Sequence, residues 1–119
     1  MLSEKLITAL SEQFVAEYES AYIYLAMSAA ADGLGLKGAS KWLFEQAQEE
    51  MAHGTNIYEY ILERGATPRF GSVEKPRTNY ENINEIFEAG LAHEQKVTEL
   101  LNGIATLALE EKDHACISL

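Results

Sequence analysis

Residues 43–61 have the sequence LFEQAQEEMAHGTNIYEYI. Steps of three and four residues connect six positions in this stretch: Leu43, Gln46, Glu50, His53, Ile57 and Ile61. This spacing keeps side chains on one face of a helix, turned toward a partner. The two ends of the stripe are apolar, but Glu50 and His53 interrupt it in the middle. The stretch therefore predicts a helix that carries a polar pair on its buried face.

Two other segments repeat this pattern, and each has a single acid in its stripe. The positions are Leu10, Phe14, Glu17, Ala21, Tyr24 and Ser28 in the first segment, and Phe87, Gly90, Glu94, Val97, Leu101 and Ile104 in the second. An isolated carboxylate costs several kcal/mol to bury even after the protein relaxes. We therefore expect Glu17, Glu50 and Glu94 to share protons, pair with cations or bind a metal.

The composition limits the classes of function. The chain has 119 residues, enough for one domain, and 19 acidic against 9 basic residues give a formal net charge of −10. This charge argues against nucleic acid or an anionic membrane as a partner and suits a protein that attracts cations, although a solvated acidic surface would look the same. No stretch approaches the ~20 apolar residues of a membrane span, and the N-terminus lacks a basic region followed by an apolar run. We therefore expect a cytoplasmic protein.

Capping and helix-breaking residues divide the chain into long helices. We expect helices at about 3–32, 38–65 and 82–112, an irregular crossover at 66–81, and a short remnant of a fourth helix at 113–119, all within one domain of residues 1–119. Ser3 and Asn82 are suitable N-caps, and Gly65 is a natural residue at which to end a helix. The crossover contains Pro68 and Pro76, which are incompatible with a continuous helix.

The lengths of the connections predict the topology. A short turn around Gly35 makes the first two helices antiparallel, whereas the 16 residues of the crossover can span ~50 Å, more than the ~40 Å length of the second helix. The crossover therefore returns the chain, and the third helix runs parallel to the second. The expected fold is all-α, an up-down-down(-up) four-helix bundle with one long crossover, here reduced to three long helices and a short C-terminal segment.

This topology places the polar residues at one height in the bundle. Glu17 lies 18 residues before Gly35, and His53 lies 18 residues after it. Glu50 and Glu94 both lie 12 residues into their helices, counted from residues 38 and 82. Because a helix rises ~1.5 Å per residue, all four side chains fall on one level. Nothing in helix propensity requires this coincidence, which favours a metal site over buried acids that only bond one another.

The residue types limit the metal that could bind at this level. Three carboxylates with one imidazole and no thiolate favour iron or manganese, with zinc as a competitor. Glu50 could bridge two ions, and such a dinuclear centre can bind Fe(II) and deliver electrons to oxygen. Tyr24 lies on the same stripe as Glu17, and its hydroxyl could bond a ligand or take part in a redox step. A tyrosine that only packs in the core explains this position equally well.

Several motifs together resemble the bacterial non-haem ferritins. They are Glu17, Tyr24, Gln48-Glu49-Glu50-x-x-His53, His93-Glu94 and the run from Glu110 to Ala115. The resemblance extends from the start of the chain to about Ala115. It implies an iron-storage protein with ferroxidase activity, which oxidises Fe(II) with oxygen or peroxide and keeps the ferric mineral inside a homo-oligomeric, 24-subunit shell.

The resemblance also implies a role for each residue of a non-haem, dinuclear iron centre. By position, the metal ligands would be Glu17, Glu50 and His53 for the first iron, Glu94 for the second iron, and Glu49 for an accessory third site. Glu50 would bridge the two irons, and Tyr24 would be the tyrosine beside them. Tyr24 and Glu50 are therefore the expected catalytic residues.

The chain departs from this family near its C-terminus. A fourth helix that starts at Asp113 would reach the level of the site at about position 130, but the sequence stops at Leu119. We expect the second iron site to keep only Glu50 and Glu94, and an apolar stripe to be exposed beyond the few hundred Å² usual on a soluble monomer. Two subunits that close their open sides together, a helix from another chain, or a shortened product of a longer gene would each account for this.

A second function follows if the centre is incomplete. The chain would then be a truncated helical assembly protein that binds iron or another divalent ion without efficient ferroxidase activity. Met51 also occupies the position of the haem-ligating methionine of bacterioferritins. A methionine that packs in the core is the expected interpretation, because the other motifs resemble the non-haem branch.

Overall fold

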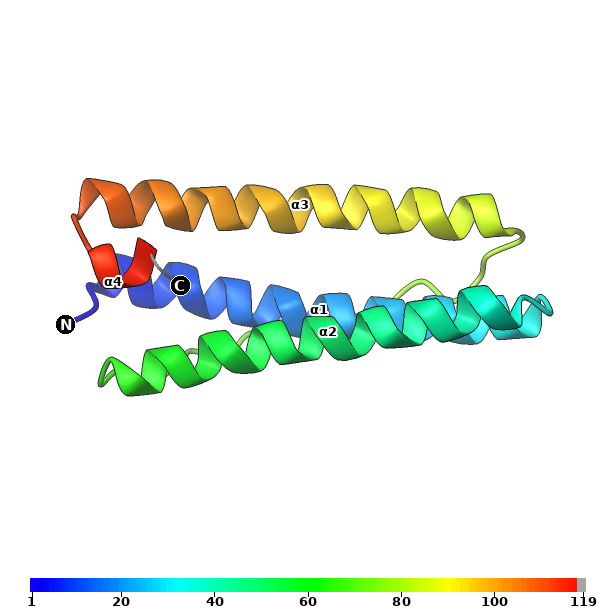
Figure 1. Cartoon of the computed structure of the whole chain (residues 1–119), viewed down its shortest axis with the longest axis horizontal. Helices are drawn as coiled ribbons and strands as arrows, with labels where there is room; N and C mark the ends of the chain where they lie inside the picture. The colour runs from blue at the N-terminus through cyan, green and yellow to red at the C-terminus, as the bar shows by residue number, and fades with distance from the viewer. Residues whose placement is uncertain (118–119) are drawn as a thin grey trace.

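The computed structural model describes residues 1–117, and all of its regular secondary structure in this range is helical. The elements are α1 (Glu4–Gly33), α2 (Lys37–Glu63), α3 (Ile83–Glu110) and the one-turn α4 (His114–Ile117). Figure 1 shows α1 and α2 running in opposite directions, and α3 running in the direction of α2 after a long crossover. The expected all-α fold with a returning crossover is confirmed. Residues 118 and 119 of the expected C-terminal remnant lie outside the described residues.

Local signals set the ends of the long helices. The Ser3 side chain accepts a hydrogen bond from the backbone N–H of Leu6 at 3.1 Å, and Asn82 caps α3 in the same way. Gly65 has a φ of 79°, in the left-handed region that glycine adopts without strain, and α2 ends two residues before it. Lys112 also has a positive φ, of 57°, and α3 accordingly ends at Glu110, two residues before the expected end.

The helix α1 occupies the centre of the bundle. It packs against both α2 and α3, whereas α2 and α3 make no backbone contact with each other. Figure 1 shows α3 set apart from the α1–α2 pair. We call the surface between α2 and α3 the open face. Phe87, Leu91 and Leu101 of α3 line hollows on this face and are 48%, 62% and 50% exposed.

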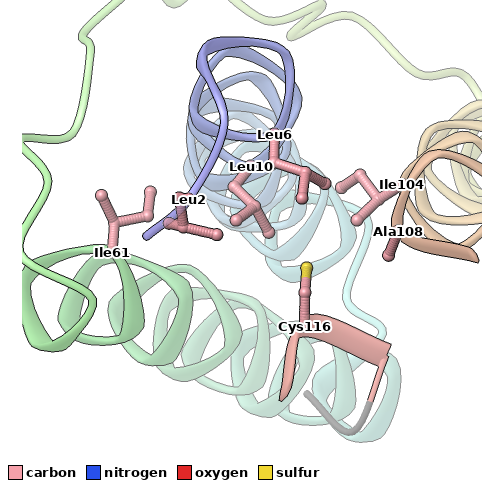
Figure 2. Close-up of a cluster of buried hydrophobic side chains, with 7 residues drawn as sticks. All are labelled: Leu2, Leu6, Leu10, Ile61, Ile104, Ala108 and Cys116. Atoms are coloured by element: carbon pink, nitrogen blue, oxygen red, sulfur yellow. The ribbon is translucent and has the colours of Figure 1, made fainter. Parts of the chain in front are cut away.

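The apolar core consists of two clusters. The first, drawn in Figure 2, comprises Leu2, Leu6, Leu10, Ile61, Ile104, Ala108 and Cys116. The second comprises Tyr24, Met27, Ala31, Leu43, Ala47, Tyr80 and Ile86. Between these clusters, α1 buries the polar side chains of Gln13, Glu17 and Ser20. We call this middle level the polar layer. No helix within residues 1–117 is both long and apolar enough to cross a membrane.

Two arginines attach the crossover to the long helices. The backbone N–H of Arg69 donates to the Ser11 hydroxyl at 3.0 Å, and its guanidinium forms an ion pair with Glu4, both on α1. Arg77 pairs with Glu85 of α3 at 2.6 Å. These contacts hold the two ends of the crossover against the bundle and so help to place α3 beside α1.

A charged contact joins the end of α2 to α4. Arg64 donates two hydrogen bonds to the Asp113 carboxylate, at 3.1 and 2.9 Å, and a third to the Tyr60 hydroxyl. Asp113 also accepts a bond from the backbone N–H of Cys116 at 3.1 Å and so caps α4. We call this contact the Arg64–Asp113 clamp. It holds α4 against the bundle, where Cys116 joins the first apolar cluster (Figure 2).

Candidate metal centre

Three of the predicted ligands come together in the polar layer. Glu17 of α1 and Glu50 and His53 of α2 each offer one ligand atom, and these atoms all lie within 4.8 Å of one another. The Nδ1 atom of His53 is 3.6 Å from Oε2 of Glu50 and 3.8 Å from Oε2 of Glu17. Both carboxylates are buried, whereas the His53 side chain is 57% exposed. The group is therefore enclosed on its carboxylate side and reachable from solvent on its imidazole side.

The helical spacing and one glycine explain this arrangement. Glu50 and His53 are three residues apart, so they lie on the same face of α2. That face comes close to α1 because the next residue, Gly54, has no side chain. A Cβ atom there would lie 2.9 Å from the ring of Tyr18 and 3.3 Å from Cβ of Glu17. Gly54 thus allows the two helices to approach each other beside the site.

The two acids of the group interact strongly. Burial and the neighbouring Glu17 carboxylate raise the pKa of Glu50 to about 9. When the site holds no cation, Glu50 therefore retains its proton at neutral pH, because two carboxylates this close cannot both be charged without a large cost. A bound cation would take the place of this proton and stabilise both charges.

One buried oxygen atom of this group has no hydrogen-bond partner. The Nε2 atom of Gln13 donates to Oε1 of Glu17 at 2.7 Å, but Oε2 of Glu17 is unpaired. Such atoms are uncommon, because they lose their hydration without gaining a hydrogen bond. A cation held by Glu17, Glu50 and His53 would satisfy this oxygen. Two carboxylates and one imidazole also suit Fe(II) or Mn(II), so the residues present fit the predicted ion.

Tyr24 and Glu94 form a second group that links α1 to α3. The Tyr24 hydroxyl donates to Oε1 of Glu94 at 2.7 Å. Burial and this carboxylate raise the pKa of Tyr24, so that the hydroxyl remains a hydrogen-bond donor at neutral pH. Glu94 also contributes to the raised pKa of Glu50, which places the two groups within electrostatic reach. Glu94 is nevertheless outside the group of three ligand atoms.

The remaining expected ligand, Glu49, lies apart from both groups. It precedes Glu50 on α2, but adjacent residues of a helix point about 100° away from each other. Glu49 is accordingly exposed and is not part of the three-ligand group. Its role in an accessory site stays a prediction, as do the iron-binding role of Glu94 and the catalytic role of Tyr24.

Sequence reasoning assigned no role to three polar residues beside the site, although His93 belongs to the His93-Glu94 motif. One is Gln13, whose position one helical turn before Glu17 was an available signal. The others are Ser20 and His93, which join α1 to α3 through a hydrogen bond. The Ser20 hydroxyl donates its proton to the backbone carbonyl of Ala16 at 2.9 Å, so it accepts from Nε2 of His93. Burial lowers the pKa of His93, which keeps this imidazole neutral. No sequence pattern pairs Ser20 with His93.

The chain that carries this group of residues matches a known family. The family model for the ferritin-like domain matches residues 7–119. The chain belongs to the ferritin family. Its two carboxylates and its imidazole all lie within the matched residues.

Curated relatives of this ferritin confirm the resemblance to bacterial non-haem ferritins. The bacterial non-heme ferritin of Staphylococcus haemolyticus is 41% identical over 118 residues, which cover 99% of this chain and 71% of the relative. The protein of the same name from Staphylococcus aureus (strain USA300) is 39% identical over 118 residues, with the same coverage.

Solved structures of ferritins agree closely with this fold. The open pore ferritin from the hyperthermophilic archaeon Archaeoglobus fulgidus superimposes with a TM-score of 0.94 at 36% identity, and the match covers 99% of this chain and 73% of that one. The Chlorobium tepidum ferritin gives a TM-score of 0.95 at 32% identity, covering 99% and 72%. The shared fold thus extends over nearly the whole of this ferritin chain.

Proposed function

We propose that this ferritin binds Fe(II) at Glu17, Glu50 and His53, oxidises it to Fe(III), and thereby serves iron storage and detoxification. The buried, unpaired Oε2 atom of Glu17 carries this proposal, because it lies 3.8 Å from Nδ1 of His53 in a group of three ligand atoms. Iron is the substrate, and oxygen or peroxide is the oxidant. With oxygen, two Fe(II) ions supply the two electrons that, with two protons, convert O₂ to peroxide.

The position of Glu50 supports a bridging role between two irons. Burial is the largest cause of its raised pKa, followed by Glu17 and then Glu94, which belong to the two different groups of the site. Glu17 and His53 would hold the first iron with Glu50, and Glu94 would hold the second. Tyr24 donates to one oxygen of Glu94 at 2.7 Å and so orients that carboxylate. Glu49 would bind a third iron from the exposed surface of α2.

Storage of a mineral requires an enclosed space that a single chain of 13.2 kDa cannot provide. The proposal therefore includes a homo-oligomer, either a 24-subunit shell or a smaller assembly in which two subunits close their open faces. The exposed side chains of Phe87, Leu91 and Leu101 support a contact on this face. We place this activity in the cytoplasm.

A second function is favoured by the position of Glu94. Because Glu94 lies outside the three-ligand group, the chain would hold one divalent ion between α1 and α2. Such an ion would stabilise a helical assembly without efficient ferroxidase activity. Calibrated size-exclusion chromatography separates the assemblies, since a shell has a mass of hundreds of kilodaltons and a pair only twice 13.2 kDa.

An anaerobic Fe(II) titration followed by addition of oxygen tests the proposed activity. We expect saturable binding near two irons per subunit, a rapid rise in ferric absorbance, and loss of that rise in Glu50→Ala. The matched control is Glu59→Ala, which removes an exposed acid from the same helix and should behave as the parent does. One bound iron and oxidation no faster than in buffer would favour the second function. Absence of binding would contradict both.

A further inference from the structure

Gln13 is a buried amide one helical turn before Glu17 on α1. It is 1% exposed, and its Nε2 atom donates to Oε1 of Glu17 at 2.7 Å. An ionised carboxylate only accepts hydrogen bonds, so the amide must turn its NH₂ end toward Glu17. Its carbonyl oxygen, Oε1, then points elsewhere and is buried without a partner.

The bond from Gln13 decides which oxygen of Glu17 is available to a cation. Oε1 is occupied, and the free Oε2 is the atom that faces Nδ1 of His53 at 3.8 Å. The last torsion of a glutamate side chain is broad, so a carboxylate without a fixed donor turns easily and presents either oxygen. Gln13 restricts this rotation and holds Oε2 in the group of three ligand atoms.

Gln13 also lines a hollow that reaches the site. The hollow has a volume of about 370 Å³, and its polar lining residues are Gln13, Glu17, His53 and Asn56. Most of its other walls are apolar, including Leu101 and Ile104. A space of this size admits water, and ordered water in such a place needs polar partners. Gln13 therefore lies between Glu17 and a space that solvent can enter.

We propose that Gln13 is a positioning residue of the metal centre. Its NH₂ group fixes the Glu17 carboxylate, so that Oε2 of Glu17 stays available to a cation. Gln13 makes no contact with the cation itself. The proposal rests on the proposed function in one respect, since it needs a cation at Glu17, Glu50 and His53. Partners that orient a ligand in this way change metal affinity by about 10- to 100-fold.

Binding of Co(II) under anaerobic conditions tests this role separately from iron oxidation. The visible absorption of Co(II) reports the number and geometry of its ligands. We expect Gln13→Met, which is similar in size but lacks the amide, to bind Co(II) about 10- to 100-fold more weakly than the parent, with an altered spectrum. The control Gln95→Met makes the same substitution at an exposed position of α3 and should match the parent.

The possible outcomes distinguish this proposal from the proposed function. A folded Gln13→Met protein with the affinity and spectrum of the parent would overturn the role of Gln13 and leave the metal site intact. A parent protein that binds neither Co(II) nor Fe(II) would overturn both. If circular dichroism shows that Gln13→Met is unfolded, Gln13→Asn replaces it, since this amide is one methylene too short to reach Glu17. The same loss of affinity is expected, and parent-like binding would overturn the proposal.

Discussion

Replacing Gly54 by alanine would test how closely α2 must approach α1 at the site. The new Cβ atom would lie 2.9 Å from two carbon atoms of the Tyr18 ring, whereas carbon atoms normally pack at about 3.5–4.0 Å. The ring is not free to move away. Its hydroxyl is hydrogen-bonded to Thr55 at 2.8 Å, and the ring makes a T-shaped contact with Phe14, with the ring centroids 5.0 Å apart. The added methyl group must therefore displace the ring or the helix.

Two opposing contributions set the size of the effect. Alanine is preferred to glycine inside a helix by about 1 kcal/mol, whereas overpacking a close contact costs about 1–3 kcal/mol. Gly54→Ala should therefore lower the free energy of unfolding by about 0–2 kcal/mol. Gly103→Ala is the matched control, because Gly103 lies within α3 and a Cβ atom there would meet no atom within 4 Å. It should raise the free energy of unfolding by about 1 kcal/mol.

Urea unfolding of the metal-free proteins, followed by circular dichroism, measures this difference of about 1–3 kcal/mol between the two variants. Equal stabilisation by Gly54→Ala and Gly103→Ala would refute the reasoning, because the close approach would then have no energetic cost. The site gives a second measurement. A Cβ atom at residue 54 would lie 3.3 Å from Cβ of Glu17, so Gly54→Ala should bind Co(II) more weakly while Gly103→Ala binds as the parent does.

Three further substitutions test the clamp and the two groups of the site. Asp113→Asn should lower the free energy of unfolding by about 1–3 kcal/mol at neutral pH, because Arg64 loses its charged partner. Arg64 lowers the pKa of Asp113, so this contribution is present above the unfolded pKa of about 3.9 and is lost as the pH falls through the folded value. The free energies of unfolding of the parent and the variant, measured in urea, should therefore converge as the pH is lowered. A difference in free energy that does not change with pH would contradict this. His53→Ala should change the free energy of unfolding by less than about 0.5 kcal/mol, because the side chain is 57% exposed. It should nevertheless weaken the binding of Co(II), measured by calorimetry. An unchanged affinity for Co(II) would exclude His53 as a ligand. Tyr24→Phe removes the donor to Glu94 and should weaken only the second iron in an anaerobic titration, whereas two unchanged sites would show that this bond is dispensable.

The sequence was sufficient to predict the helices and the level of the site. Steps of three and four residues indicate which face of a helix is buried, and capping residues such as Ser3 and Asn82 mark where α1 and α3 begin. A helix is a rod with a fixed rise, so counting residues from the turn places Glu17 and His53 at one height. The structure brings both side chains into a group with Glu50.

Contacts between helices were harder to predict. Counting residues gives the height of a side chain along the bundle, but it does not give the distance between side chains on different helices. Counted from the expected helix starts, Glu94 lies as far into its helix as Glu50 does, but the backbones of α2 and α3 are not in contact, and Glu94 pairs with Tyr24 instead. The Arg64–Asp113 clamp joins residues 49 positions apart, and no local pattern encodes such a pair. The unpaired oxygen of Glu17 likewise becomes visible only when its neighbours are in place.

The less extensive packing of α3 on α1, compared with that of α2 on α1, has a consequence for how the site responds to fluctuations. Segments with few packing contacts open first in the native state, and α3 packs on α1 less extensively than α2 does, while it meets α2 only through side chains such as the Trp42–Phe87 ring pair. Such an opening would carry Glu94 away and break its bond to Tyr24. Glu17, Glu50 and His53 would remain together, because all three belong to the α1–α2 hairpin. The site formed by Glu17, Glu50 and His53 can therefore persist while Glu94 moves away and returns. The three-ligand group and the Tyr24–Glu94 group need not form or be lost together.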